Sequence, residues 1–136
     1  MNSLERARFD ALLHEVLAAI PPALQELIEE MPVVVEDEPS REILIEMGED
    51  PDAPDAAESL CGLHTGVAFT EQSVESSGEL PSEVRLFRRG IIAEAGGWEG
   101  ADADDRVHEQ IWITLLHEIG HQYGLDEDDL EELGYQ

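Results

Sequence analysis

The segment from Asp105 to Tyr123 constrains the fold most, because its pattern predicts a long helix that is buried over most of its surface. The segment contains no proline, the aspartates at its start offer N-caps, and Gly124 suits the position just after a helix. At about 100° per residue, its large apolar side chains spread over more than half of the helix circumference. The remaining polar stripe consists of Gln110, Thr114, His117, Glu118 and His121.

Two histidines of this stripe, His117 and His121, lie four residues apart, and Glu118 directly follows the first. Residues four apart share one helix face with Cβ atoms about 5 to 6 Å apart. Both imidazoles can therefore reach one zinc ion at the usual distance of about 2.0 to 2.1 Å. Glu118 points about 100° further around the helix, where it flanks the ion. This arrangement is typical of zinc hydrolases; the alternative is a pair of hydrogen-bonded core histidines.

A catalytic zinc ion usually takes three protein ligands and keeps one position for water. No histidine follows His121, so a third ligand from the C-terminal segment must be a carboxylate. Gly124 can adopt a positive φ angle and turn the chain back toward the ion. The candidates after it are Asp126, Glu127, Asp128, Asp129, Glu131 and Glu132.

The C-terminal motif resembles the signature His-Glu-x-x-His-x-x-Gly-x-x-Asp of the short bacterial zincin-like metallopeptidases, also called minimal zincins. The resemblance covers nearly the whole chain, with a helix, a strand, a glycine-bounded segment and a second strand in the same order as in that group: Phe9–Ile20, Val33–Pro39, Gly62–Gly66 and Leu80–Arg88. It implies an α+β fold of the minimal zincin-like type. A small mixed or antiparallel sheet would pack on helices, with the active-site helix near the C-terminus.

Carried over by position, the resemblance implies that His117 and His121 are metal ligands and that Glu118 is the general base. It implies one Zn²⁺ ion per chain as cofactor. The aspartate ligand position, three residues after the motif glycine, is occupied by Glu127. Glutamate is one methylene longer, so Asp126 or Asp128 takes this role if Glu127 does not reach the ion.

These residues predict a zinc-dependent metallopeptidase that hydrolyses peptide bonds through a metal-bound water with Glu118 as general base. One alternative is a metal-dependent endoribonuclease with the motif His-x-x-x-His-x-x-Gly-x-Asp-His. The chain keeps both histidines, the glycine and Asp126 of that motif, but has Glu127 in place of its last histidine. Another alternative is a non-catalytic interaction module, in which the ion closes the C-terminus onto the core.

The charge of the chain bears on its partners. The 136 residues fit a single domain, 1–136, and carry a net charge of -26, with 33 acidic residues against seven arginines. Such a charge repels nucleic acid and anionic membranes, and it attracts basic peptide segments or simply keeps the protein soluble. We therefore expect a peptide or protein substrate, with no nucleic acid or membrane partner; the oligomeric state stays open.

The single cysteine, Cys61, cannot form an intrachain disulfide, and the N-terminus lacks a basic leader and an uninterrupted apolar span. Both observations favour a cytoplasmic protein.

The rest of the chain alternates short apolar runs with acidic loops. Helical spacing predicts a helix over Phe9–Ile20 and, after two prolines, a second over Ala23–Met31. The β-prone runs are Val33–Glu36, Glu42–Glu46, Gly66–Thr70 and Glu83–Phe87, of which Glu42–Glu46 suits a helix equally well. Glu83–Phe87 is either an exposed edge strand near the site, to which an extended peptide could add, or an internal strand.

Overall fold

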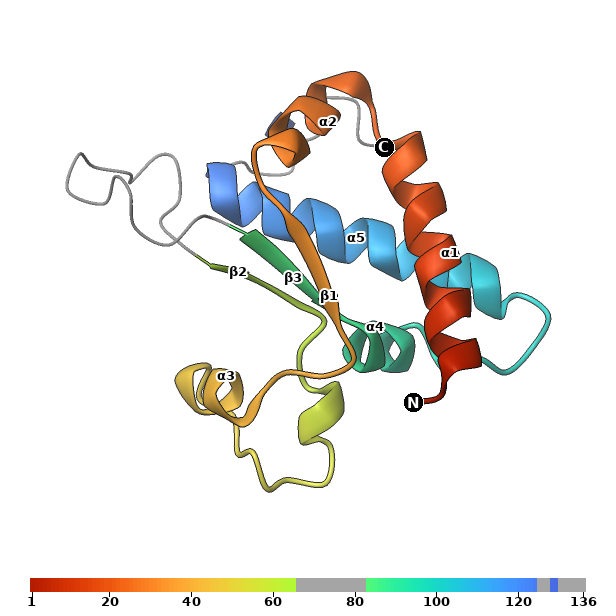
Figure 1. Cartoon of the computed structure of the whole chain (residues 1–136), viewed down its shortest axis with the longest axis vertical. Helices are drawn as coiled ribbons and strands as arrows, with labels where there is room; N and C mark the ends of the chain where they lie inside the picture. Colours follow the sequence, from red (N-terminus) through yellow and green to blue (C-terminus); the bar gives the residue numbers. More distant parts are fainter. Residues whose placement is uncertain (66–82, 125–127, 130–136) are drawn as a thin grey trace.

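The computed structural model describes residues 1–65, 83–124 and 128–129 (Figure 1). Its elements, in chain order, are α1 (Ser3–Ala19), α2 (Pro22–Glu29), β1 (Val33–Glu36), α3 (Arg41–Glu46), the 3₁₀ helix η1 (Ala56–Glu58), β2 (Gly62–Thr65), β3 (Glu83–Phe87), α4 (Arg88–Glu94) and α5 (Ala103–Tyr123). The predicted strand over Gly66–Thr70 lies outside the described residues. Within the described residues, helices α1 to α5 and a small mixed sheet confirm the predicted α+β class.

The three described strands form one sheet in the order β1-β3-β2. β1 runs parallel to β3, with Val33 opposite Val84, and β2 runs antiparallel to it, with Gly62 opposite Leu86. Glu83–Phe87 is therefore the central strand. Of the two alternatives, the internal strand is confirmed and the exposed edge strand was wrong. The burial of Val84, Leu86 and Phe87 explains this position, because a strand with neighbours on both sides is covered more completely than an edge strand.

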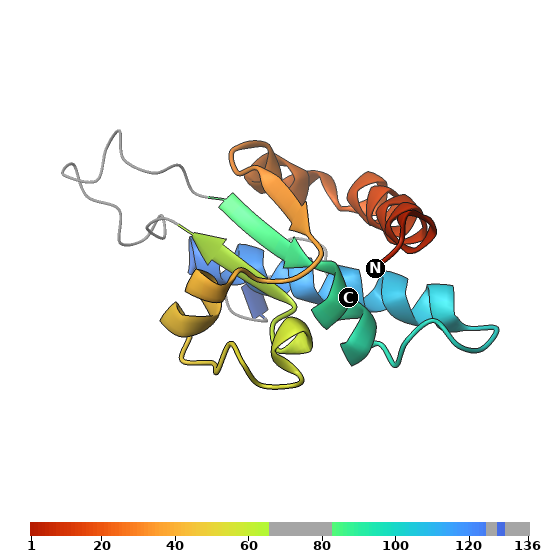
Figure 2. The ribbon, with the colours of Figure 1, turned by 60° about the horizontal axis from the view of Figure 1, so that its bottom comes forward.

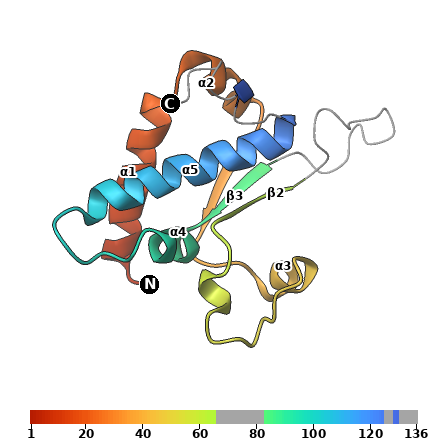
Figure 3. The same cartoon turned by 180° about the vertical axis from the view of Figure 1, so that it is seen from behind.

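Helix α5 covers one face of this sheet, as the view from behind shows (Figure 3). Val84 and Leu86 alternate along β3 toward the core, where they join the apolar side of α5. Arg85, which lies between them, points to the opposite face. There Arg85 forms ion pairs with Glu83, at 2.8 Å, and with Glu36 of the neighbouring strand. The face toward α5 is thus apolar, and the opposite face combines this ion-pair group with apolar residues such as Val34 and Leu63.

Helix α1 packs against the N-terminal half of α5 (Figures 1 and 2). Its buried side chains recur at helical spacing: Phe9, Leu12, Leu13 and Val16. The helix begins at Ser3, six residues before the predicted start, because the Asn2 side chain accepts a hydrogen bond from the Glu5 N–H at 2.8 Å. Among the helices that the structure describes, none alone is long and apolar enough to cross a membrane; α1 and α2 meet that test only as a pair bent by 117°.

Local contacts explain two further helices. For the run Glu42–Glu46 the helix, one of the two predicted alternatives, is confirmed. Arg41–Glu46 is helical because the Ser40 hydroxyl accepts a hydrogen bond from the Ile43 N–H at 3.2 Å, which caps the first turn. Helix α4 was not predicted, and it follows β3 without a break. Gly90 makes this helix fit, because a Cβ at that position would lie 1.9 Å from the Leu60 carbonyl oxygen.

A group of ion pairs connects α1 to the ends of the strands. Asp37, just after β1, accepts hydrogen bonds from Arg6 at 2.7 Å and from Arg88 at 3.0 Å. Arg88 also pairs with Asp10 of α1 at 3.0 Å, and its side chain is only 13% exposed. The Arg6 hydrogen bond, assisted by Arg88, holds the pKa of the Asp37 carboxyl below its usual range.

We expect Asp37→Asn to lower the urea midpoint of unfolding at pH 7, because it removes both ion pairs. The folded-state pKa of Asp37 lies below its unfolded value of about 3.9, so its contribution is complete above that pH and is lost as the pH falls through the folded pKa. The difference between wild type and variant should therefore shrink between pH 5 and about pH 3.

The matched control is Asp52→Asn, since Asp52 also pairs with one arginine but both side chains are largely exposed. Exposed pairs contribute little, so this control should barely change the midpoint at pH 7. If the difference in urea midpoint between Asp37→Asn and wild type stays constant from pH 7 to pH 3, the lowered pKa of Asp37 is not the cause of its stabilising effect.

Candidate functional site

Helix α5 carries all three motif residues near its C-terminal end. It ends as the sequence predicts: Gly124 has a left-handed φ of 65°, and its N–H donates to the Gly120 carbonyl. It begins at Ala103, two residues earlier than expected. The Asp102 side chain does not cap the helix and instead forms an ion pair with Arg106 one turn later.

The two histidines lie on one open face of α5. His117 and His121 are both exposed, and their ring centroids are 4.4 Å apart with an interplanar angle of 68°. The alternative of two core histidines was therefore wrong. An exposed pair of imidazoles at this separation can offer two nitrogen atoms to a single metal ion that approaches from solvent.

Glu118 differs from its histidine neighbours in that it is buried, at 8% exposed. Its Oε1 lies 3.6 Å from Nδ1 of His121, so the carboxylate reaches the margin of the histidine face. The aliphatic part of the side chain is covered by protein. Packing thus restricts the side chain while leaving its carboxylate beside the imidazoles.

Strand β2 provides that cover. A Cβ built on Gly62 would lie 2.9 Å from Cγ2 of Thr114 and 3.2 Å from Cγ of Glu118, so the strand backbone passes directly over these two side chains. Thr114 is only 5% exposed. The polar stripe predicted from sequence is therefore divided into a covered part, Thr114 and Glu118, and an open part, His117 and His121.

The outer edge of β2 is unpaired among the strands that the structure describes. The Phe87 N–H donates to the Cys61 carbonyl at 2.8 Å, which makes Cys61 and Phe87 a hydrogen-bonded pair of the antiparallel ladder. Hydrogen-bonded pairs alternate with non-bonded ones along such a ladder. The main-chain N–H and C=O groups of Gly62 and His64 therefore point away from β3, toward the open edge.

Of the candidates for the third ligand, Glu127 and Asp126 lie outside the described residues. Asp128 is described and exposed. Within residues 1–65, 83–124 and 128–129, no group of three or more His, Cys, Asp or Glu side chains is arranged to hold a metal ion. The two imidazoles that do come together suit zinc, which takes nitrogen ligands, better than calcium or magnesium, which prefer oxygen.

Cys61, next to the covering glycine, has a partly buried thiol. Burial, and then the negative charge of Glu94, raise the pKa of this thiol. The side chain of His64, its partner in the Cys-x-x-His spacing, lies outside what the structure describes.

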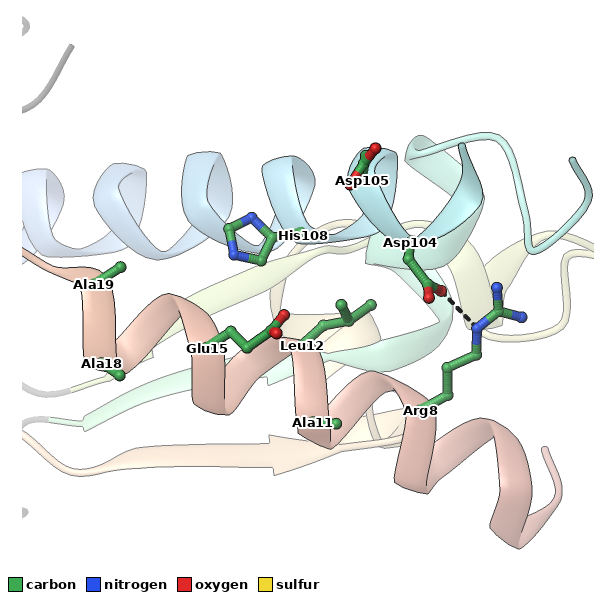
Figure 4. A pocket seen from close by; sticks show the side chains of 9 residues that line it. All are labelled: Arg8, Ala11, Leu12, Glu15, Ala18, Ala19, Asp104, Asp105 and His108. Carbon is green, nitrogen blue, oxygen red and sulfur yellow. Dashed lines mark hydrogen bonds and ion pairs between the residues drawn. The ribbon is translucent and has the colours of Figure 1, made fainter. Parts of the chain in front are cut away.

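A groove of about 850 Å³ lies elsewhere, between α1 and the N-terminal half of α5 (Figure 4). Arg8 and Asp104 form an ion pair of 2.6 Å at one end, and His108 lines the α5 side. His108 precedes His117 by nine residues, which places it about half a circumference away on the helix. No motif residue lines this groove, so it is separate from the histidine face.

The comparison with known families agrees with these features. The model of a family described as zincin-like metallopeptidase matches residues 28–135, a region that includes the whole sheet and all motif residues. Among curated proteins, none matches the chain. Because the match covers most of its length, the chain belongs to the zincin-like metallopeptidase family.

Proposed function

We propose that this chain is a zinc-dependent peptidase in which His117 and His121 hold the ion and Glu118 is the general base. One observation carries the proposal: α5 exposes both imidazoles on one face and buries the stem of the intervening glutamate beside them. We assign the third ligand to Glu127, with Asp126 or Asp128 as the alternatives. One ion per chain is expected from this set.

When bound, zinc would polarise the scissile carbonyl and lower the pKa of water toward about 7. Glu118 then accepts the water proton on its carboxylate and passes it to the leaving nitrogen. Its packing under β2 favours this task, because a side chain that is already ordered loses little freedom when it meets the water. The exposed histidine face leaves room for substrate.

The edge of β2 is our candidate for substrate binding, in place of the central strand. An extended peptide can pair with the outward main-chain groups of Gly62 and His64 as an added strand. Such pairing uses only main-chain atoms, so it tolerates many sequences. It also brings the peptide next to Glu118, which lies directly beneath Gly62.

The surface charge favours a peptide over RNA as substrate. Every arginine of the chain is engaged in an ion pair with a carboxylate: Arg6, Arg8, Arg41, Arg85, Arg88, Arg89 and Arg106. Binding of a polyanion needs cationic groups, and here these are already neutralised. A cationic peptide segment instead meets the large excess of acidic residues.

We expect His121→Ala to reduce the zinc content from about one ion per chain to nearly none, because two protein ligands are too few for a stable site. Elemental analysis after dialysis against zinc-free buffer measures this. His108→Ala is the matched control, since it lies on the same helix but in the separate groove, and it should keep its zinc. Equal zinc contents in the two variants would contradict the ligand assignment.

We expect Glu118→Gln to keep its zinc and to lose peptidase activity by at least about 100-fold, as removal of a general base does. The assay follows cleavage of a fluorescence-quenched cationic peptide library by the zinc-loaded protein. Glu109→Gln, an exposed glutamate of the same helix, should behave as wild type.

Other results of these zinc and activity measurements would each favour a different function or a different role for Glu118. Loss of zinc from Glu118→Gln would mean that Glu118 is a ligand. Cleavage of RNA but not of peptides by the wild-type protein would favour the ribonuclease, and absence of both activities would favour the non-catalytic module.

A further inference from the structure

Strand β2 approaches α5 so closely at Gly62 that a side chain at this position would fit only if its neighbours shifted. A Cβ at this position would lie 2.9 Å from Cγ2 of Thr114, closer than real Cβ contacts come, and 3.2 Å from Cγ of Glu118. It would also lie 3.1 Å from the Arg85 carbonyl oxygen on β3. The absence of a side chain at Gly62 therefore sets the distance between the edge strand and the motif helix.

An added methyl group at Gly62 could be accommodated only on the helix side. On the sheet side its neighbour is the backbone of β3, which is held between two strands. On the helix side, Thr114 is β-branched, and its hydroxyl accepts a hydrogen bond of 3.4 Å from the Gln110 amide, so its rotation is restricted. Glu118 is the more flexible of the two contacted side chains, and it would be displaced first.

We propose that Gly62 is the positioning residue for Glu118. By lacking a side chain, it lets the strand backbone press on the Glu118 stem and fixes the carboxylate beside His121. Thr114 is the second support, because it fills the space next to Glu118 one helical turn earlier. The catalytic part of this inference rests on the proposed function, whereas the packing part does not.

The same glycine links the base to the substrate. Its main-chain groups point to the open edge, while its α-carbon faces Glu118. A peptide that pairs with β2 would therefore have the residue opposite Gly62 held nearest to the base. The register of main-chain pairing, more than any side-chain pocket, would then select the bond that is cleaved.

The test substitutes Gly62→Ala in the full chain. We expect the zinc content to stay near one ion and kcat to fall roughly 10- to 100-fold, because misplacement of a catalytic group by about 1 Å has effects of this size. KM should change much less than kcat. Thr114→Ser removes the methyl group nearest to the new Cβ, so adding it to Gly62→Ala should restore part of kcat and of the melting temperature.

The matched control is Val35→Ala on the opposite edge strand, which packs against the core away from the site. It should lower the melting temperature without lowering kcat at a temperature where it is folded. If Gly62→Ala alone does not fold, the double variant with Thr114→Ser should fold. Failure of both to fold, or an equal loss of kcat in Val35→Ala, would overturn the positioning role.

A double-mutant cycle on the zinc-free protein gives a readout independent of activity. The shift in urea midpoint caused by Gly62→Ala should be smaller when Thr114 is serine, and again when Glu118 is alanine, because contacting residues are not additive. If the shifts in urea midpoint are additive, the proposed contact of Gly62 with Thr114 and Glu118 is wrong. If the shifts are coupled but kcat of Gly62→Ala is unchanged, the contact exists but Gly62 does not position Glu118 for catalysis. If the wild-type protein cleaves no peptide, the proposed function is wrong, and so is the catalytic part of this inference.

Discussion

The contact between strand β2 and helix α5 determines how the motif is presented. Because Gly62 has no side chain, the strand backbone covers Thr114 and Glu118. His117 and His121, on the adjacent face of the helix, stay open to solvent. This division gives the three motif residues different environments although they share one helix. The imidazoles can receive a ligand from outside, and the carboxylate between them is held by packing.

The central strand and helix α1 hold α5 in place for this contact. Val84 and Leu86 of the central strand pack into the core beside the apolar side of α5, and α1 supports the N-terminal half of the helix. Ion pairs around Asp37 and Arg88 connect α1 to the ends of the strands. Packing in the core and these ion pairs therefore hold the sheet, α1 and α5 together.

The sequence predicts where most elements lie but not how the strands pair. The runs Val33–Glu36 and Glu83–Phe87 are strands with the predicted bounds, whereas helix α4 and strand β2 were not predicted. Residues 105–123 are marked at both ends and have a clear helical period, so α5 was found to within two residues. The strand pairing depends on contacts far apart in the chain, so no local pattern could tell that Glu83–Phe87 is central. The packing role of Gly62 also could not be predicted, because nothing in the neighbouring sequence distinguishes a glycine needed for close packing from any other glycine. The burial of Glu118 follows from that packing and was equally hidden.

The most direct test is a crystal structure of the zinc-loaded protein with anomalous scattering recorded at the zinc edge. We predict a single strong peak within bonding distance of both His117 and His121. One carboxylate from the segment after Gly124 should be the third protein ligand, and Glu118 should lie near the ion without binding it. A peak bound by four protein ligands, or a peak elsewhere with both imidazoles unbound, would contradict the account.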